Sequence, residues 1–286
     1  MRGRKIEFGL LNREWLWGKA LLILLIWLPL VPGLSARDRA QEQAARIVGQ
    51  IQRADYEGDR TALKRLYDEL APFAKNQDIA ARVEYWRGFA LWRRTINGFN
   101  DKVEPTALQE DLRQAIDEFD RAVKLDPDFV DAKIGKLSCL GLLAFATRQQ
   151  DPGSTRVQQL IGETRQLWKD VEPAAQANPR FFWVIGPMVW NTPPERAGGQ
   201  TKAIEGYEKG LDAMRNHKAV TKNPLEPSWG EPELLMSLAW SNLNRTTPDV
   251  KVAEQYAQSA LDLVPDWHYV RDILMPQIQN AKKKQG

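Results

Sequence analysis

Residues 115–127 read AIDEFDRAVKLDP, and the spacing inside this stretch indicates how the chain folds. Ala115, Phe119 and Ala122 stand at offsets 0, 4 and 7, and Pro127 follows at offset 12. On an α-helix the first three offsets share one face, where small residues let a neighbouring helix approach and the aromatic ring fills the gap. The proline then ends the helix because it lacks a backbone N–H. The stretch is therefore typical of one helix in a closely packed pair.

The same spacing recurs twice. The stretch AEQYAQSALDLVP at 253–265 keeps offsets 0, 7 and 12, with Ala257 in place of the aromatic residue. The stretch AIEGYEKGL at 203–211 keeps offsets 0, 4 and 7, but Arg215 stands where the proline would be. A recurring pattern indicates repeats that bury their apolar faces against one another. The spacing resembles the tetratricopeptide repeat over residues 79–275. That resemblance implies an all-α fold, a right-handed superhelical α-solenoid of about five helix pairs with a C-terminal capping helix.

The rest of the chain favours the same fold class, because no stretch alternates apolar and polar residues as a strand would. We expect helices at 38–56, 60–75, 79–96, 106–125, 129–148, 154–176, 180–190, 201–215, 231–243, 248–263 and 267–282. The breaks between them are short and rich in Pro, Gly and Asn. We therefore expect one repeat domain over residues 37–286.

The first 36 residues predict export. An apolar run at 20–34 follows several basic residues, as in a signal peptide. It is shorter than the roughly 20 residues that a spanning helix prefers, and Pro29 and Pro32 would disturb such a helix. Two interpretations stay open, a cleaved signal peptide and an uncleaved anchor that contacts the inner membrane as a short transmembrane helix. Both place the repeat domain outside the cytoplasm, in the periplasm or facing it.

Charge and cysteine content exclude some classes. The formal net charge of +3 comes from the leader, because residues 37–286 hold equal numbers of basic and acidic side chains. A basic face, the usual mark of a nucleic-acid-binding protein, is therefore not expected. Cys139 is the only cysteine, which excludes an internal disulfide, and its leucine-rich surroundings predict a small buried hydrophobe.

No pattern of residues argues for catalysis. The two histidines, His217 and His268, are far apart, and no Gly-x-Ser-x-Gly elbow is present. Residues 198–202, GGQTK, precede a helix but lack the spacing of a nucleotide-binding loop, so a tight turn with an N-cap is the simpler interpretation. We expect neither an enzyme nor a metal or cofactor site.

The repeat resemblance implies a concave surface lined by the first helix of each pair. Its register implies binding positions at Arg87, Arg94, Asp131, Ser138, Asn191 and Trp240. Such a surface predicts an exported scaffold that binds a protein or peptide partner in the bacterial cell envelope.

A second hypothesis starts from the apolar run FFWVIGPMVW at 181–190. A helix that is hydrophobic all round is usually buried between neighbours. Alternatively, an interruption at Gly186-Pro187 would leave a small-ligand pocket walled by Trp183, Trp190 and Asn191. Residues 178–204 also resemble exported bacterial repeat proteins and, more distantly, the periplasmic repeat subunit of TRAP-type transporters. That resemblance implies a ligand-binding component serving a transporter, although this chain lacks the family's lipid-anchoring cysteine.

Overall fold

The computed structural model describes residues 36–216 and 223–285, and within these ranges the chain is all-α, with no β-strand. The apolar run at 20–34 and His217 lie outside the described residues. The α-helices are α1 (Ala36–Glu57), α2 (Arg60–Leu70), α3 (Ala80–Asn100), α4 (Pro105–Leu125), α5 (Val130–Gln150), α6 (Thr155–Ala175), α7 (Pro179–Trp190), α8 (Gln200–Asn216), α9 (Glu231–Asn244), α10 (Val250–Leu263) and α11 (Met275–Gln285). Shorter segments are the 3₁₀ turns η1 (Ala71–Lys75) and η2 (Pro194–Arg196) and the π-helical η3 (Tyr269–Leu274). Among the described helices, none combines the length and the apolar character that crossing a bilayer would require.

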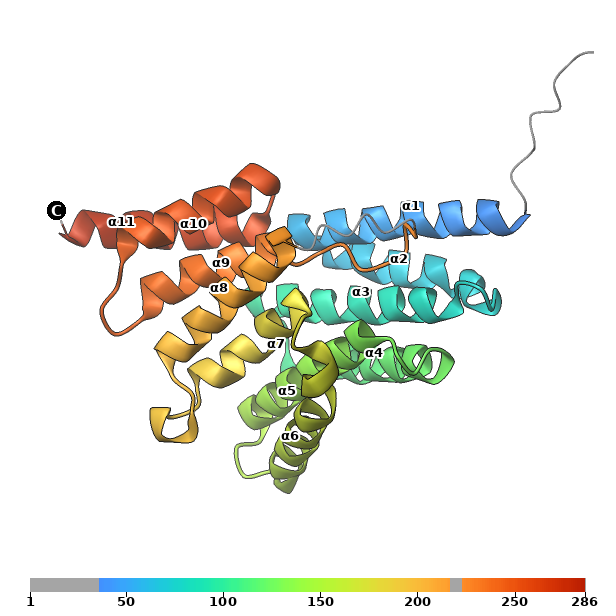
Figure 1. The fold of residues 1–286 in the computed structure, drawn as a ribbon, viewed down its shortest axis with the longest axis horizontal. Helices are drawn as coiled ribbons and strands as arrows, with labels where there is room; N and C mark the ends of the chain where they lie inside the picture. Colours follow the sequence, from blue (N-terminus) through green and yellow to red (C-terminus); the bar gives the residue numbers. More distant parts are fainter. Residues whose placement is uncertain (1–35, 217–222, 286) are drawn as a thin grey trace, which may run out of the picture.

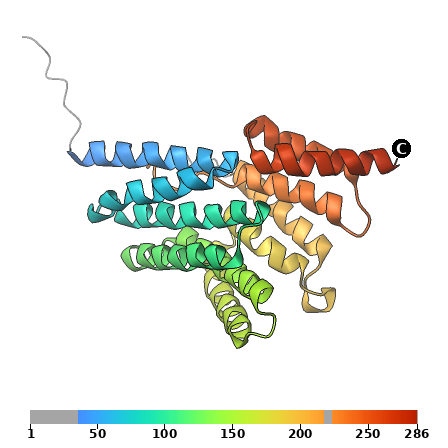
Figure 2. The same cartoon turned by 180° about the vertical axis from the view of Figure 1, so that it is seen from behind.

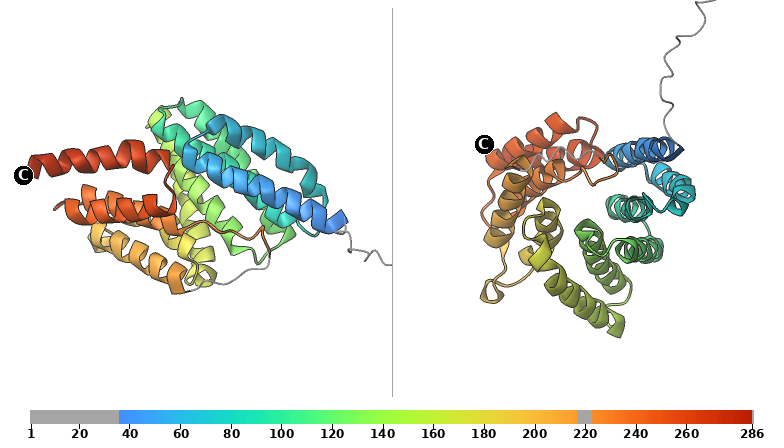
Figure 3. Two further views of the ribbon diagram at one scale, coloured as in Figure 1. Left: turned by 90° about the horizontal axis from the view of Figure 1, so that it is seen from above. Right: turned by 45° about the vertical axis from the view of Figure 1, so that its right-hand side comes forward.

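Helices that follow one another in sequence pack side by side along two arms. In the first arm each of α1 to α6 contacts the next, and in the second arm the same holds from α7 to α11, with η3 packed between α10 and α11 (Figures 1 and 2). The arms join where α7 packs against α5. The oblique view shows many of the helices nearly end-on, with α1 and the C-terminal helices approaching each other across the top (Figure 3, right). The arrangement leaves α3, α7 and α9 around a shared interior.

The repeated spacing predicts the packing face correctly. Ala115, Phe119 and Ala122 are fully buried on α4. The Phe119 ring lies against two glycines on neighbouring helices: a Cβ added to Gly135 would stand 2.5 Å from its Cζ, and one added to Gly88 would stand 3.0 Å from the ring. The aromatic side chain therefore fills space that only glycine leaves open.

The copy at 203–211 packs by the same rule. Tyr207 on α8 lies against Gly186 of α7, where an added Cβ would be 2.1 Å from the Tyr207 ring. Ala203 and Gly210 on the same face are also buried. This close approach brings α7 and α8 together and places Tyr207 beside the interior.

Helix α7 agrees with the helix expected at 180–190, and the alternative of a break at Gly186-Pro187 is wrong. The helix α7 runs through Pro187 to Trp190. Pro187 lacks the N–H that would donate to the Trp183 carbonyl, yet the helix continues for one more turn. In that turn the Pro187 carbonyl accepts from the Asn191 side chain (2.8 Å) and the Met188 carbonyl accepts from Thr192 Oγ1 (2.8 Å). The predicted final helix also differs, because its first turn is the π-helical η3.

The described residues that lead into α9 lie against the first arm. Residues 223–230 lie against α1 and α3, where Gln41 Nε2 donates to Asn223 Oδ1 (3.1 Å) and Trp86 Nε1 donates to the Leu225 carbonyl (2.8 Å). Trp229 is buried and donates from Nε1 to Tyr85 Oη (2.7 Å). This connector, residues 223–230, thus covers one face of α3 with the protein's own chain.

Candidate functional site

A cavity of about 310 Å³ lies in the shared interior between α3, α7, α8 and α9. Six aromatic side chains line it: Trp183 and Trp190 from α7, Tyr207 from α8, Trp240 from α9, and Trp267 and Tyr269 at the start of the last helical segment. On α7 the lining positions 183, 187 and 190 follow the 4 and 3 residue steps of one helix face. Trp190 and Trp240 meet edge to face, with ring centroids 5.2 Å apart. The walls are therefore mainly apolar and aromatic, as is usual for pockets that bind small molecules.

Polar groups enter the cavity from a few positions. Arg93, Asn97 and Asn100 follow one face of α3, Ser237 comes from α9, and Asn191 stands at the end of α7. The Asn191 side-chain amide already donates a hydrogen bond to the Pro187 carbonyl. The Asn97 amide donates to the backbone and side-chain oxygens of Asp55 (3.0 and 3.1 Å). The polar groups are thus few, and several already have partners within the chain.

Arg93 differs from the other polar residues because it is a buried charge with one free donor. Only 3% of the residue is exposed. Its Nε donates to Asp55 Oδ2 at 2.7 Å, and its Nη2 lies 3.5 Å from Glu233 Oε1. Its Nη1 is buried and has no hydrogen-bond partner among the described residues. The guanidinium is also held near aromatic rings, 5.2 Å from the Trp183 centroid.

The two carboxylates around Arg93 are themselves held by other groups. Glu233 Oε1 accepts from Tyr56 Oη (3.0 Å), and its Oε2 accepts from the Gly230 backbone at the start of α9 (2.9 Å). Burial raises the pKa of the Asp55 carboxyl to about 6, against the opposing effect of Arg93. At neutral pH the Asp55 carboxylate is therefore mainly ionised, and it forms a buried ion pair with Arg93.

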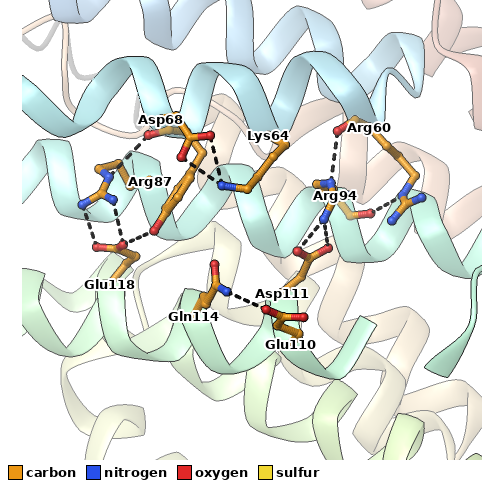
Figure 4. Close-up of polar contacts among 10 residues, drawn as sticks. Arg60, Lys64, Asp68, Arg87, Arg94, Glu110, Asp111, Gln114 and Glu118 are labelled. Carbon is orange, nitrogen blue, oxygen red and sulfur yellow. Dashed lines mark hydrogen bonds and ion pairs between the residues drawn. The ribbon is translucent and has the colours of Figure 1, made fainter. Parts of the chain in front are cut away.

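Two arginines predicted as binding residues lie on the other side of α3, where carboxylates and backbone carbonyls of neighbouring helices hold them (Figure 4). Arg87 donates from Nη1 to Glu84 (3.1 Å) and Glu118 (3.2 Å). Arg94 bonds both carboxylate oxygens of Asp111, and its Nε donates to the Arg60 carbonyl (3.1 Å). These contacts join α3 to α2 and α4.

The remaining predicted positions divide between the cavity and other places. Asp131 is bound by Arg180, whose Nε lies 2.6 Å from Oδ1, and Ser138 is half-buried on α5 away from the lining residues. Trp183, Trp190, Asn191 and Trp240 line the same cavity. The structure therefore brings four of the eight predicted residues together.

Sequence reasoning missed Arg93, Tyr207 and the pair at the start of the last helical segment, Trp267 and Tyr269. Tyr207 was identified only as a packing residue of the repeat. Arg93 stands next to Arg94 in the sequence, and only the contacts of Arg93 with Asp55 on α1 and Glu233 on α9 distinguish the two residues. Cys139 is buried, as predicted, and burial raises the pKa of its thiol.

Comparison with known proteins gives one solved structure with a similar fold. No family model and no curated protein matches the chain. The structure resembles the HusA haemophore from Porphyromonas gingivalis with a TM-score of 0.55 and 17% sequence identity. The match covers 76% of this chain and 100% of the haemophore chain. At this identity the likeness concerns the helical fold.

Proposed function

We propose that this protein binds a small, flat, mostly apolar molecule in the cavity between α3, α7 and α9. The observation that carries the proposal is the set of six aromatic side chains around a volume of about 310 Å³. Ligand pockets commonly have volumes of roughly 300–1,000 Å³, so the cavity is at the small end of that range. Compounds of one to three rings suit this volume best.

The structural neighbour supports ligand binding and adds one specific compound to the candidates. By its name it is a haemophore. The cavity lining of this chain includes Met236 and Tyr269, whose side-chain types hold haem iron in some proteins. A porphyrin is much larger than a two-ring compound, so we rank smaller aromatic molecules above haem and include haemin as a probe.

The test is a calorimetric titration of the full-length chain with one- to three-ring aromatic compounds and with haemin. We expect saturable binding of at least one of these compounds at one site per chain. Trp190→Leu removes one aromatic wall and should raise the Kd about tenfold, in line with aromatic contacts of roughly 0.5–1.5 kcal/mol plus the lost buried area.

The matched control is Trp168→Leu, because Trp168 is a half-buried tryptophan on α6 that does not line the cavity. This variant should keep the native Kd. The proposal fails if no compound binds, or if the two variants weaken binding equally.

We also propose the finer architecture that the repeat resemblance implies, a right-handed superhelical solenoid of tetratricopeptide type. The sequential packing of α1 to α6 and of α7 to α11 supports it, as do the contacts of α3 with α1 and α5 and of α7 with α5 and α9. In such a solenoid, alternate helices form the inner layer. The cavity would then lie on the inner layer, because α3, α7 and α9 are alternate helices.

A second candidate function is the binding of an extended peptide or protein partner in the cell envelope. The connector 223–230 favours it, because α3 already holds this segment through Trp86 and the Leu225 carbonyl. Cross-linking in intact cells, followed by identification of the captured species, tests this function. Export itself rests on the leader, and sequencing of the mature amino terminus tests whether it is cleaved.

A further inference from the structure

If the cavity is the binding site proposed above, the hydrogen bonds of Arg93 indicate the chemical class of the ligand. Three facts meet at this residue: it lines the cavity, it is almost completely buried, and its Nη1 has no hydrogen-bond partner in the part of the chain that the structure describes. Buried polar groups in folded proteins nearly always have a partner. A ligand that offers an acceptor at this position would supply the missing one.

The other side chains around Arg93 do not compete for this donor. Asp55 takes Nε and Glu233 lies at Nη2, and both carboxylates are held by further donors. The rings of Trp183 and Trp229 lie 5.2 and 5.9 Å from the guanidinium carbon. The unpartnered nitrogen is therefore buried in mostly aromatic surroundings next to the cavity, where a single acceptor on an otherwise apolar molecule would be recognised.

Charge decides which kind of acceptor fits. Arg93 already faces two carboxylates, Asp55 and Glu233. A third negative group at Nη1 would be repelled by both in a region with little water. Arg180, the other cation that acts on Glu233, is bound by Asp131. No cation described near the cluster is thus free to balance an anionic ligand.

We infer that the ligand is a flat apolar molecule that carries a neutral hydrogen-bond acceptor, such as a ketone or amide oxygen, which accepts from Arg93 Nη1. A carboxylate at the same position would bind more weakly. The aromatic walls would supply most of the contact area, and Arg93 would fix the orientation of the ligand.

The test compares three probes of nearly the same shape on the native full-length chain at pH 7. The probes are 2-acetylnaphthalene, which has a ketone oxygen, 2-isopropenylnaphthalene, which has a CH₂ group in its place, and 2-naphthoate, which is an anion. We expect the ketone to bind at least fivefold tighter than each of the other two.

The outcomes separate the inference from the function on which it rests. If the ketone and the isopropenyl compound bind equally, the cavity binds aromatic molecules but Arg93 does not select them, and the inference is overturned alone. If 2-naphthoate binds tightest, the cavity accepts anions and the neutral class is wrong. If none of the three binds, and the wider panel also fails, the proposed function falls with the inference.

A pair of variants assigns the preference to Arg93. Arg93→Lys keeps a positive charge beside Asp55 but loses the planar set of donors. We expect the ratio of ketone to isopropenyl affinity to fall below twofold. Arg94→Lys is the control, because Arg94 does not line the cavity, and it should leave the ratio unchanged. If a folded Arg93→Lys variant keeps the native ratio of ketone to isopropenyl affinity, Arg93 is not the group that selects the ketone. The comparison of the three probes on the native chain tests the inference even if this variant does not fold.

Discussion

Arg93 and Arg94 are neighbours in the sequence, yet they face different sides of α3. Arg94 gives its donors to Asp111 and to the Arg60 carbonyl, and together with Arg87 it forms a closed polar layer between α2, α3 and α4 (Figure 4). Arg93 is more deeply buried and keeps one nitrogen free beside an aromatic cavity. The difference shows that buried charge alone does not mark a site. Arg94 is held by groups on α2 and α4 and joins those helices, whereas Arg93 lines a cavity and has one buried nitrogen without a partner among the described residues.

The largest expected effect separates the two arginines by stability. Arg93→Met leaves Asp55 and Glu233 buried without their cation, so we expect the free energy of unfolding to fall by about 3–5 kcal/mol. Arg94→Met should lower it by about 1–2 kcal/mol, because Arg60 also acts on Asp111 and the Arg94 side chain is 24% exposed. Urea unfolding followed by circular dichroism measures both values. Equal losses would show that the two sides of α3 do not differ in this way.

The next effect concerns the backbone of the cavity wall. Gly186→Ala would place a Cβ 2.1 Å from the Tyr207 ring, so α7 and α8 must move apart, and we expect a loss of about 1–3 kcal/mol in the free energy of unfolding. Gly206→Ala on α8 is the matched control, because nothing lies within 4 Å of the added atom. It should raise stability by up to about 1 kcal/mol through helix propensity. A Gly186→Ala variant as stable as the native chain would mean that this contact is loose.

The smallest effect tests the closed layer through pH. Burial, together with the neighbouring Glu118, raises the pKa of the Glu84 carboxyl to about 7. A carboxyl with a raised pKa binds its proton more tightly in the folded state, so its contribution to stability is present at low pH and is lost as pH rises from about 5 through 7. Glu84→Gln imitates the protonated form and should remove about 1 kcal/mol of this decline, after allowance for solvent screening.

The control for this measurement is Glu110→Gln, since Glu110 is an exposed carboxylate on the same layer. Unfolding at pH 5, 6, 7 and 8 should give the native slope for this variant and a smaller slope for Glu84→Gln. Identical slopes for the two variants would contradict the shared burial of Glu84 and Glu118.

The sequence predicts those parts of the molecule that depend on local spacing. Ala115, Phe119 and Ala122 share a buried face because the three positions lie on one helix. Trp183 and Trp190 reach the cavity together for the same reason. The eleven predicted helices agree with α1 to α11 to within a few residues at most of their ends, apart from the first turn of the last one.

What the sequence does not predict depends on contacts between distant segments. Arg93 is distinguished from Arg94 only by Asp55 and Glu233, which are 38 and 140 positions away. The connector 223–230 shows no repeat pattern that would place it on α3.

The central claim is that the cavity, rather than another surface, holds the ligand. Its most direct test is the ¹H–¹⁵N spectrum of the tryptophan indoles in the native chain, recorded during titration with 2-acetylnaphthalene. We predict that the signals of Trp183, Trp190 and Trp240 move and saturate together, while that of Trp168 on α6 stays in place. Saturable binding that shifts Trp168 and leaves the three cavity signals unmoved would contradict the account.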